Sequence, residues 1–197
     1  MSEKVITKKK LGTRQLTVVG MLSAISVVLG LTGYGFIPLP FAKATIMHIP
    51  VIIGAIVEGP MVGMLIGLIF GIFSIIQNIM APNILSFALI NPLVSVVPRI
   101  LIGLTSYYFY NLLRSKKEGI RIIVATVIGS LTNTFGVLTM IYILYAARYA
   151  HAKGISASAA AKTIYGIALI NGVPEALIAV TIAVPVILAV KKIKKYK

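Results

Sequence analysis

The sequence predicts an all-α integral membrane protein, a bundle of six transmembrane helices with both termini in the cytoplasm. Three observations support this fold class. Hydrophobic residues make up 58% of the 197 positions and charged residues only 12%, with a mean hydropathy of +1.00. The apolar residues form separate runs, and the basic residues gather in short groups between those runs. Because a water-soluble domain could not bury so much apolar surface, we expect a single membrane domain over residues 1–197.

Helices are expected where apolar runs are separated by charged residues or by Pro, Gly and Asn. A crossing of the bilayer needs about 20 apolar residues, and all runs but the second reach that length. The second would rise only about 21 Å against a hydrocarbon core of about 30 Å. The expected helices span residues 16–37, 44–57, 61–80, 85–113, 120–147 and 166–190.

The distribution of Lys and Arg predicts the orientation, since cytoplasmic loops carry an excess of these residues. One side of the membrane would hold the basic groups at residues 4–14, 114–121 and 191–197. The other side would hold only Lys43, Arg148, Lys153 and Lys162. Both termini are therefore expected in the cytoplasm, which requires an even number of crossings and supports the short second helix. The net charge of +15 then reflects contact with the lipid bilayer and not with nucleic acid.

Several kinds of chemistry are excluded by the residues present. The chain has no cysteine, which excludes disulfides, thiolate metal sites and cysteine nucleophiles. Its four acidic residues and two histidines are scattered, so neither a catalytic constellation nor a metal site is expected. No G-x-x-x-x-G-K-[ST] sequence occurs, so ATP hydrolysis is not expected of this chain. We expect no enzyme and no cofactor, and any energy must come from a gradient or from partner subunits.

Two stripes of small residues predict close packing of helices. On the first helix, Gly20 and Ala24 are four residues apart. On the third, the same spacing repeats at Gly59, Gly63, Gly67 and Gly71. Either stripe could face a helix of this chain or another protein. The intramolecular interpretation is favoured for the third helix, and both interpretations have equal weight for the first.

Prolines interrupt two of the expected helices. Pro92 and Pro98 lie in the fourth run, and Pro174 and Pro185 lie in the sixth. Each removes a backbone donor and kinks or breaks its helix. In a membrane such breaks persist only where they are buried in protein or line a cavity. The fourth and sixth helices are therefore the expected walls of a binding site, and the loop 33–48 is long enough to cover it as a lid.

Polar side chains near the outer ends of the helices are candidates for binding a small polar molecule. Arg99 and Glu175 are the two charges expected within the membrane. Counting along the helices places Arg99 past the midplane, where pairing with Glu175 or Glu58 is more plausible than contact with a ligand. The alternative for some candidates, the tyrosines above all, is a role as interfacial anchors. The expected substrate-binding residues are Gln77, Asn78, Asn91, Tyr142, Tyr145, Arg148, Asn171 and Glu175.

The residues from His48 to Gly71 resemble a known family. This run contains an Ile-Pro pair, a Gly-Pro turn and the glycine stripe, and it is similar to the second and third helices of substrate-specific S components of energy-coupling-factor (ECF) transporters. Residues 98–103 are similar to the fourth helix of those proteins, and residues 171–175 to part of the sixth. The resemblance covers most of the chain and is greatest to the S components of the pantothenate type.

That resemblance implies partners as well as a fold. S components bind a vitamin or precursor in the outer half of a six-helix bundle, and they associate with a membrane coupling subunit and two cytoplasmic ATPase subunits. An Ala-x-x-x-Ala motif on their first helix contacts the coupling subunit. Gly20 and Ala24 match that motif, with Gly in place of the first Ala.

We therefore expect a high-affinity vitamin-binding subunit of an ATP-driven importer in a prokaryotic plasma membrane. Pantothenate is the expected substrate, and Arg148, Lys43, Asn91 and Asn171 suit its carboxylate, amide and hydroxyls. One alternative is another vitamin or precursor, such as riboflavin, folate or a thiamine precursor. A second is a self-sufficient proton-coupled carrier that uses Glu175, and a third is a structural membrane partner.

Overall fold

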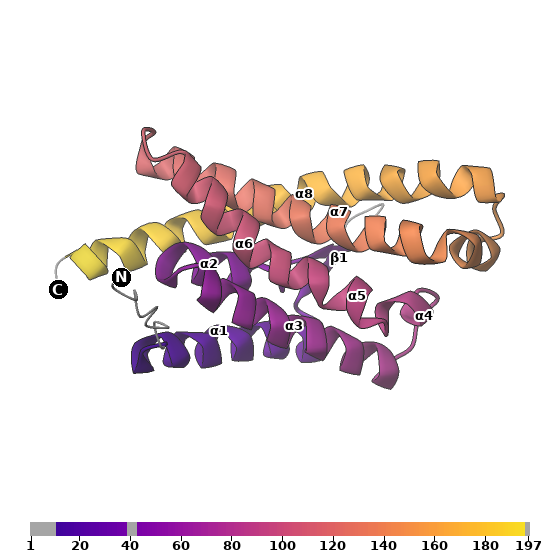
Figure 1. Ribbon diagram of the computed structural model, residues 1–197, viewed down its shortest axis with the longest axis horizontal. Helices are drawn as coiled ribbons and strands as arrows, with labels where there is room; N and C mark the ends of the chain where they lie inside the picture. Colours follow the sequence, from indigo (N-terminus) through magenta and orange to yellow (C-terminus); the bar gives the residue numbers. More distant parts are fainter. Residues whose placement is uncertain (1–10, 39–42, 196–197) are drawn as a thin grey trace, which may run out of the picture.

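Helices make up most of the chain in the computed structural model, which describes residues 11–38 and 43–195. The basic group at 4–10, the loop residues 39–42 with Pro40, and the last two residues lie outside these ranges. The elements run side by side along one long axis (Figure 1). In chain order they are α1 Thr13–Thr32, β1 Phe36–Pro38, β2 Lys43–Thr45, α2 Ile49–Glu58, α3 Pro60–Met80, α4 Ser86–Leu89, α5 Pro92–Ser95, α6 Val97–Leu112, α7 Glu118–Lys153 and α8 Ala157–Lys195.

Within the described ranges, five stretches are long and apolar enough to cross a membrane. They are α1, α3, the stretch Pro92–Leu112 that contains α5 and α6, α7, and α8 from Ala159 onward. The short helix α2 has 10 residues and rises about 15 Å, roughly half of a hydrocarbon core. The sixth crossing and the cytoplasmic placement of the termini stay predictions.

The first two helices are shorter than expected because a β-hairpin separates them. Gly33 has a left-handed backbone with φ of 77° and ends α1 at Thr32, a conformation that glycine adopts without steric cost. The chain then forms an antiparallel pair in which Phe36 lies opposite Thr45. The residues expected at the end of the first helix and at the start of the second therefore belong to β1 and β2.

The fourth expected helix is broken into three. Asn91 caps α5 by accepting a hydrogen bond from the Leu93 amide at 2.9 Å, and Pro92 begins that helix. Pro98 lies in the first turn of α6, where a proline needs no hydrogen-bond partner for its nitrogen. In the sixth segment the prolines do not break the helix, because α8 continues through both Pro174 and Pro185. A kink at either proline, the other expected outcome, stays a prediction.

Three glycines of the stripe, Gly63, Gly67 and Gly71, pack within the molecule, whereas no described residue lies within 4 Å of a Cβ atom on Gly59. A Cβ atom on Gly71 would lie 2.7 Å from the Cα of Val96, and one on Gly63 would lie 3.0 Å from the Cα of Gly103. Side chains at these positions would push α6 away, so the glycines set the close approach of α3 and α6. Gly20 on α1 differs, since no described residue lies within 4 Å of the corresponding position.

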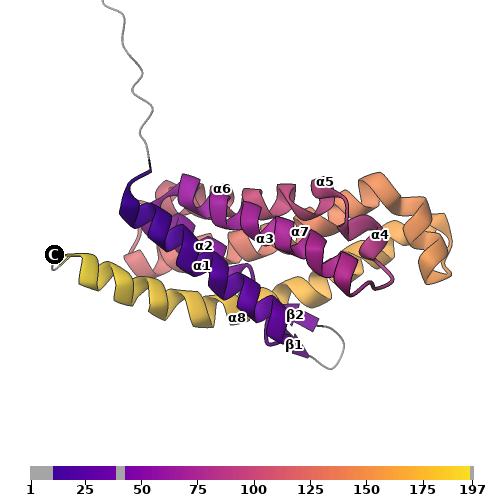
Figure 2. The ribbon, with the colours of Figure 1, turned by 90° about the horizontal axis from the view of Figure 1, so that it is seen from below.

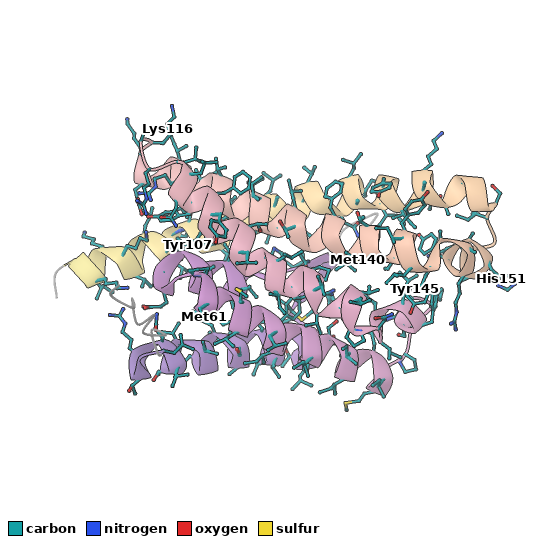
Figure 3. The ribbon with its side chains drawn as sticks, viewed as in Figure 1. Met61, Tyr107, Lys116, Met140, Tyr145 and His151 are labelled. Carbon is teal, nitrogen blue, oxygen red and sulfur yellow. The ribbon has the colours of Figure 1, made fainter. Side chains whose placement is uncertain are left out.

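The two ends of the bundle differ in charge. The described chain begins and ends at one end, as Figures 1 and 2 show. Lys116, in the turn between α6 and α7, lies at this end, and His151 lies at the opposite end (Figure 3). An ion pair links α7 and α8 at the first end, where Glu118 binds Lys191 at 2.9 Å, and within α7 Glu118 also binds Arg121 at 2.8 Å. The side of the membrane on which this end lies stays a prediction.

Candidate functional site

A cavity of about 300 Å³ lies among α3, α6, α7 and the β-hairpin. Its volume is at the lower bound for sites that enclose a small organic molecule. It lies beside the second half of α3 and the beginning of α6, away from the end of the bundle that holds the termini. Its lining residues are Phe36, Thr45, Met47, Phe70, Ser74, Gln77, Asn78, Ala81, Asn83, Leu89, Arg99 and Asn133.

Arg99 is a buried cation in the cavity wall. Only 7% of the residue is exposed. Its Nη1 donates to the carbonyl of Val94 at 2.9 Å, and its guanidinium lies 5.4 Å from the centre of the Phe70 ring. Its Nε has no hydrogen-bond partner among the described residues. A buried guanidinium with an unused donor is suited to a carboxylate.

The structure does not overturn the depth expected for Arg99, because its backbone lies against Gly67, which is nearer the beginning of α3 than its end. The route of the chain to that position does differ from the expectation. The expectation treated residues 85–99 as one helix that advances 1.5 Å per residue. The structure instead places α4 and α5 before α6, so Arg99 is only the third residue of its helix. Neither expected ion pair of Arg99 is present among the described residues, and Glu58 pairs instead with Arg14 at 3.0 Å and Lys194 at 3.4 Å.

The last turns of α3 supply three polar side chains to the cavity, from Ser74, Gln77 and Asn78. Residues three and four apart share one face of a helix. Gln77 donates to the carbonyl of Gly30 at 2.9 Å. Asn78 donates to the carbonyl of Ser74 at 2.8 Å and accepts a hydrogen bond from Asn83 at 3.1 Å. These bonds hold the amides in place before any ligand binds.

Asn133 on α7 is a cavity residue that the sequence analysis did not select. It is 5% exposed, and its Oδ1 has no hydrogen-bond partner among the described residues. A buried amide without a partner is costly, so this oxygen is available to a donor on a ligand. An Asn in the middle of an apolar run was the available signal.

Glu175 borders the cavity without lining it. Its carboxylate accepts hydrogen bonds from the Thr45 amide at 2.9 Å and from the Thr134 hydroxyl. These bonds join β2 to α7 and α8. Phe36 and Thr45 of the hairpin line the cavity, so the expected lid contributes to its wall. The expectation that the sixth segment forms a wall is not met, because no described residue of α8 lines the cavity.

Four other predicted residues form a separate cluster near the far end of α7. Asn91 donates to the Tyr145 hydroxyl at 2.9 Å, and Arg148 lies 4.5 Å from the centre of the Phe87 ring. Tyr142 lies beside Tyr165, with ring centres 6.0 Å apart. Tyr142 to Arg148 lie about 14–22 Å farther along α7 than Asn133. The eight predicted residues therefore do not converge on one pocket, and Asn171 is not among the cavity residues either.

A family model described as "ECF transporter, substrate-specific component" matches residues 14–187. The chain belongs to this family. As a substrate-specific ECF component it is a multi-pass membrane protein that takes part in transport and is not an enzyme.

Similar proteins include a curated relative and a solved structure. The chain is 27% identical over 201 residues to the pantothenic acid transporter PanT of Lactococcus lactis subsp. cremoris (strain MG1363), an alignment that covers 93% of this chain and 97% of PanT. Its structure resembles that of ThiT from Listeria monocytogenes with a TM-score of 0.53 and 16% sequence identity, covering 88% of this chain and 96% of ThiT. The second likeness concerns the fold alone.

Proposed function

We propose that this ECF component is the vitamin-binding subunit of an ATP-driven importer and that its substrate is pantothenate. The observation that carries this proposal is the buried Arg99 in a cavity that also contains the amides of Gln77, Asn78 and Asn133. Pantothenate has one carboxylate, one amide and two hydroxyls, so a single buried cation among amides matches its functional groups. The similarity to PanT over nearly the whole chain supports the same substrate.

In this proposal Arg99 holds the carboxylate, and the amide side chains hold the amide and the hydroxyls. Phe36, Met47 and Phe70 provide apolar contact in the same cavity. This assignment replaces Arg148 as the expected carboxylate partner, because Arg148 is exposed and lies over Phe87. Energy for uptake would come from the coupling subunit and the two ATPase subunits.

The test compares pantothenate with pantothenol, in which an uncharged hydroxymethyl group replaces the carboxylate. The purified protein should bind pantothenate. Arg99→Gln should weaken that binding by roughly 10–150-fold, because it removes a charge-assisted hydrogen bond to the carboxylate. Pantothenol should bind Arg99→Gln and the unaltered protein equally. Isothermal titration calorimetry measures all four affinities.

Arg148→Gln is the matched control, since it removes the same charge outside the cavity and should leave both affinities unchanged. If Arg99→Gln weakened both ligands equally, Arg99 would support the fold and not bind the carboxylate. If a different vitamin co-purified with the protein and pantothenate did not bind, the proposed substrate would be wrong.

A self-sufficient carrier is the second candidate, because Glu175 is a buried carboxylate within a membrane span. Its two hydrogen bonds to Thr45 and Thr134 favour a structural role instead.

A further inference from the structure

A second concave site lies between α1 and α8, at the end of the bundle that holds the termini. This groove has a volume of about 680 Å³ and is lined by Arg14, Val190, Ile193 and Lys194. Both α1 and α8 pack against α2, which lies between them (Figure 1). The groove shares no lining residue with the cavity at Arg99 and is separate from it.

The groove is apolar on one part and basic on another. Val190 and Ile193 lie on the last turns of α8, and Ile193 is 63% exposed. Arg14 lies in the first turn of α1, and Lys194 lies next to the end of α8. The cations thus lie at helix ends, where lipid headgroups would be, with Ile193 at the same level and Val190 one turn farther from the end of α8.

The cations of the groove are only partly neutralised. Arg14 and Lys194 share the single carboxylate of Glu58, at 3.0 Å and 3.4 Å. The Arg14 side chain is still 61% exposed and that of Lys194 is 42% exposed. A guanidinium has five N–H donors and an ammonium has three, so donors remain for a further acceptor. Two cations and one carboxylate leave a net positive charge beside an apolar wall.

We infer that the α1–α8 groove binds an anionic phospholipid, with its phosphate against Arg14 and Lys194 and an acyl chain along Val190 and Ile193. Basic pockets between transmembrane helices hold anionic headgroups in this way. The surface that fits a coupling subunit lies elsewhere on α1: Gly20 and Ala24 are rotated by about 80–120° from Arg14 around the helix. The inference does not depend on the vitamin or on the orientation of the protein.

Native mass spectrometry of the full chain tests this inference, using phosphatidylglycerol and phosphatidylcholine as probes in detergent. The unaltered protein should retain phosphatidylglycerol in preference to phosphatidylcholine. The double variant Arg14→Gln/Lys194→Gln should lower phosphatidylglycerol binding at least about fivefold, since each basic residue near a headgroup contributes roughly that factor. The double variant Lys116→Gln/Lys117→Gln removes two exposed cations at the same end and should change binding less than twofold.

A second variant is needed as a control, because Arg14→Gln/Lys194→Gln leaves the Glu58 carboxylate without its two cationic partners and could disturb folding. Val190→Trp fills the groove, keeps the three charges, and should lower phosphatidylglycerol binding by a similar factor. Equal binding of the two lipids, equal losses in the Lys116/Lys117 control, or unchanged binding in Val190→Trp would each overturn the inference. If the groove variants kept the lipid but lost assembly with the coupling subunit, the groove would be a protein-docking surface.

Discussion

Arg99 and Glu175 are opposite charges buried in the same part of the bundle, but their surroundings differ. They attract each other electrostatically, yet no ion pair joins them among the described residues. Arg99 faces the cavity and keeps one donor unpaired, whereas both oxygens of Glu175 accept hydrogen bonds from the protein. Ligand binding is therefore assigned to Arg99, and the attachment of the hairpin to Glu175.

Substitutions of Glu175 should show whether its hydrogen bonds to the hairpin and to α7 stabilise the fold. Glu175→Gln keeps an acceptor for the Thr45 amide and a polar partner for Thr134, so we expect a small change in stability. Glu175→Ala leaves buried polar groups without partners and should lower the free energy of unfolding by about 1–3 kcal/mol. Thermal unfolding in detergent, followed by circular dichroism, compares the two variants.

The same variants test the carrier alternative. A proton carrier requires a carboxylate that titrates, so Glu175→Gln would abolish gradient-driven uptake by the chain alone in liposomes. We expect no such uptake even by the unaltered protein, because the proposed importer needs its partner subunits. Gradient-driven uptake that disappears in Glu175→Gln would contradict the structural role.

At the scale of the elements, the two small-residue stripes have different environments. Gly63, Gly67 and Gly71 of the α3 stripe lie against the backbone of α6 or of the residues just before it, and this confirms the intramolecular interpretation for these three positions. On α1, the buried side chains of Ser23 and Ser26 face the bundle. Gly20 and Ala24 are exposed on another part of the helix. The four-residue spacing alone could not distinguish the two cases. It shows which residues share a helix face, but not what that face contacts.

Substitutions in the two stripes should therefore affect different properties, namely assembly for the stripe on α1 and stability for the stripe on α3. Gly20→Leu adds a side chain where nothing lies within 4 Å, so it should leave folding and ligand affinity unchanged while preventing assembly with the coupling subunit. Gly67→Ala is the contrasting variant, since its Cβ would overlap the backbone of Arg99 and should destabilise the protein by about 1–3 kcal/mol. Co-purification with the coupling subunit and thermal unfolding measure the two effects. Assembly that survives Gly20→Leu would exclude this stripe from the interface.

At the scale of the whole molecule, hydropathy and charge predicted the membrane-spanning bundle well, because those properties depend only on composition along the chain. Local backbone geometry was harder to predict. The hairpin after Gly33 and the break at Pro92 each shorten an apolar run without changing its composition. The cavity was predicted in part for the same reason. Gln77 and Asn78, which were expected to bind substrate, line the cavity. Arg99 lines it too, although counting along one unbroken helix made pairing with a carboxylate the more plausible role for Arg99.

The orientation of the whole bundle is a prediction that the lack of cysteines makes easy to test. Single cysteines at Lys116, Lys192 and Lys162 would each be exposed, the first two at the end with the termini and the third near the start of α8. The positive-inside bias places the first two in the cytoplasm. In intact cells, a membrane-impermeant maleimide should label Lys162→Cys, and should label Lys116→Cys and Lys192→Cys only after permeabilisation. The unaltered chain provides a background without thiols.

Labelling of Lys116→Cys from outside would show that the orientation is the reverse of the predicted one. Labelling of only one of Lys116→Cys and Lys192→Cys in intact cells would mean that α7 and α8 do not both cross the membrane.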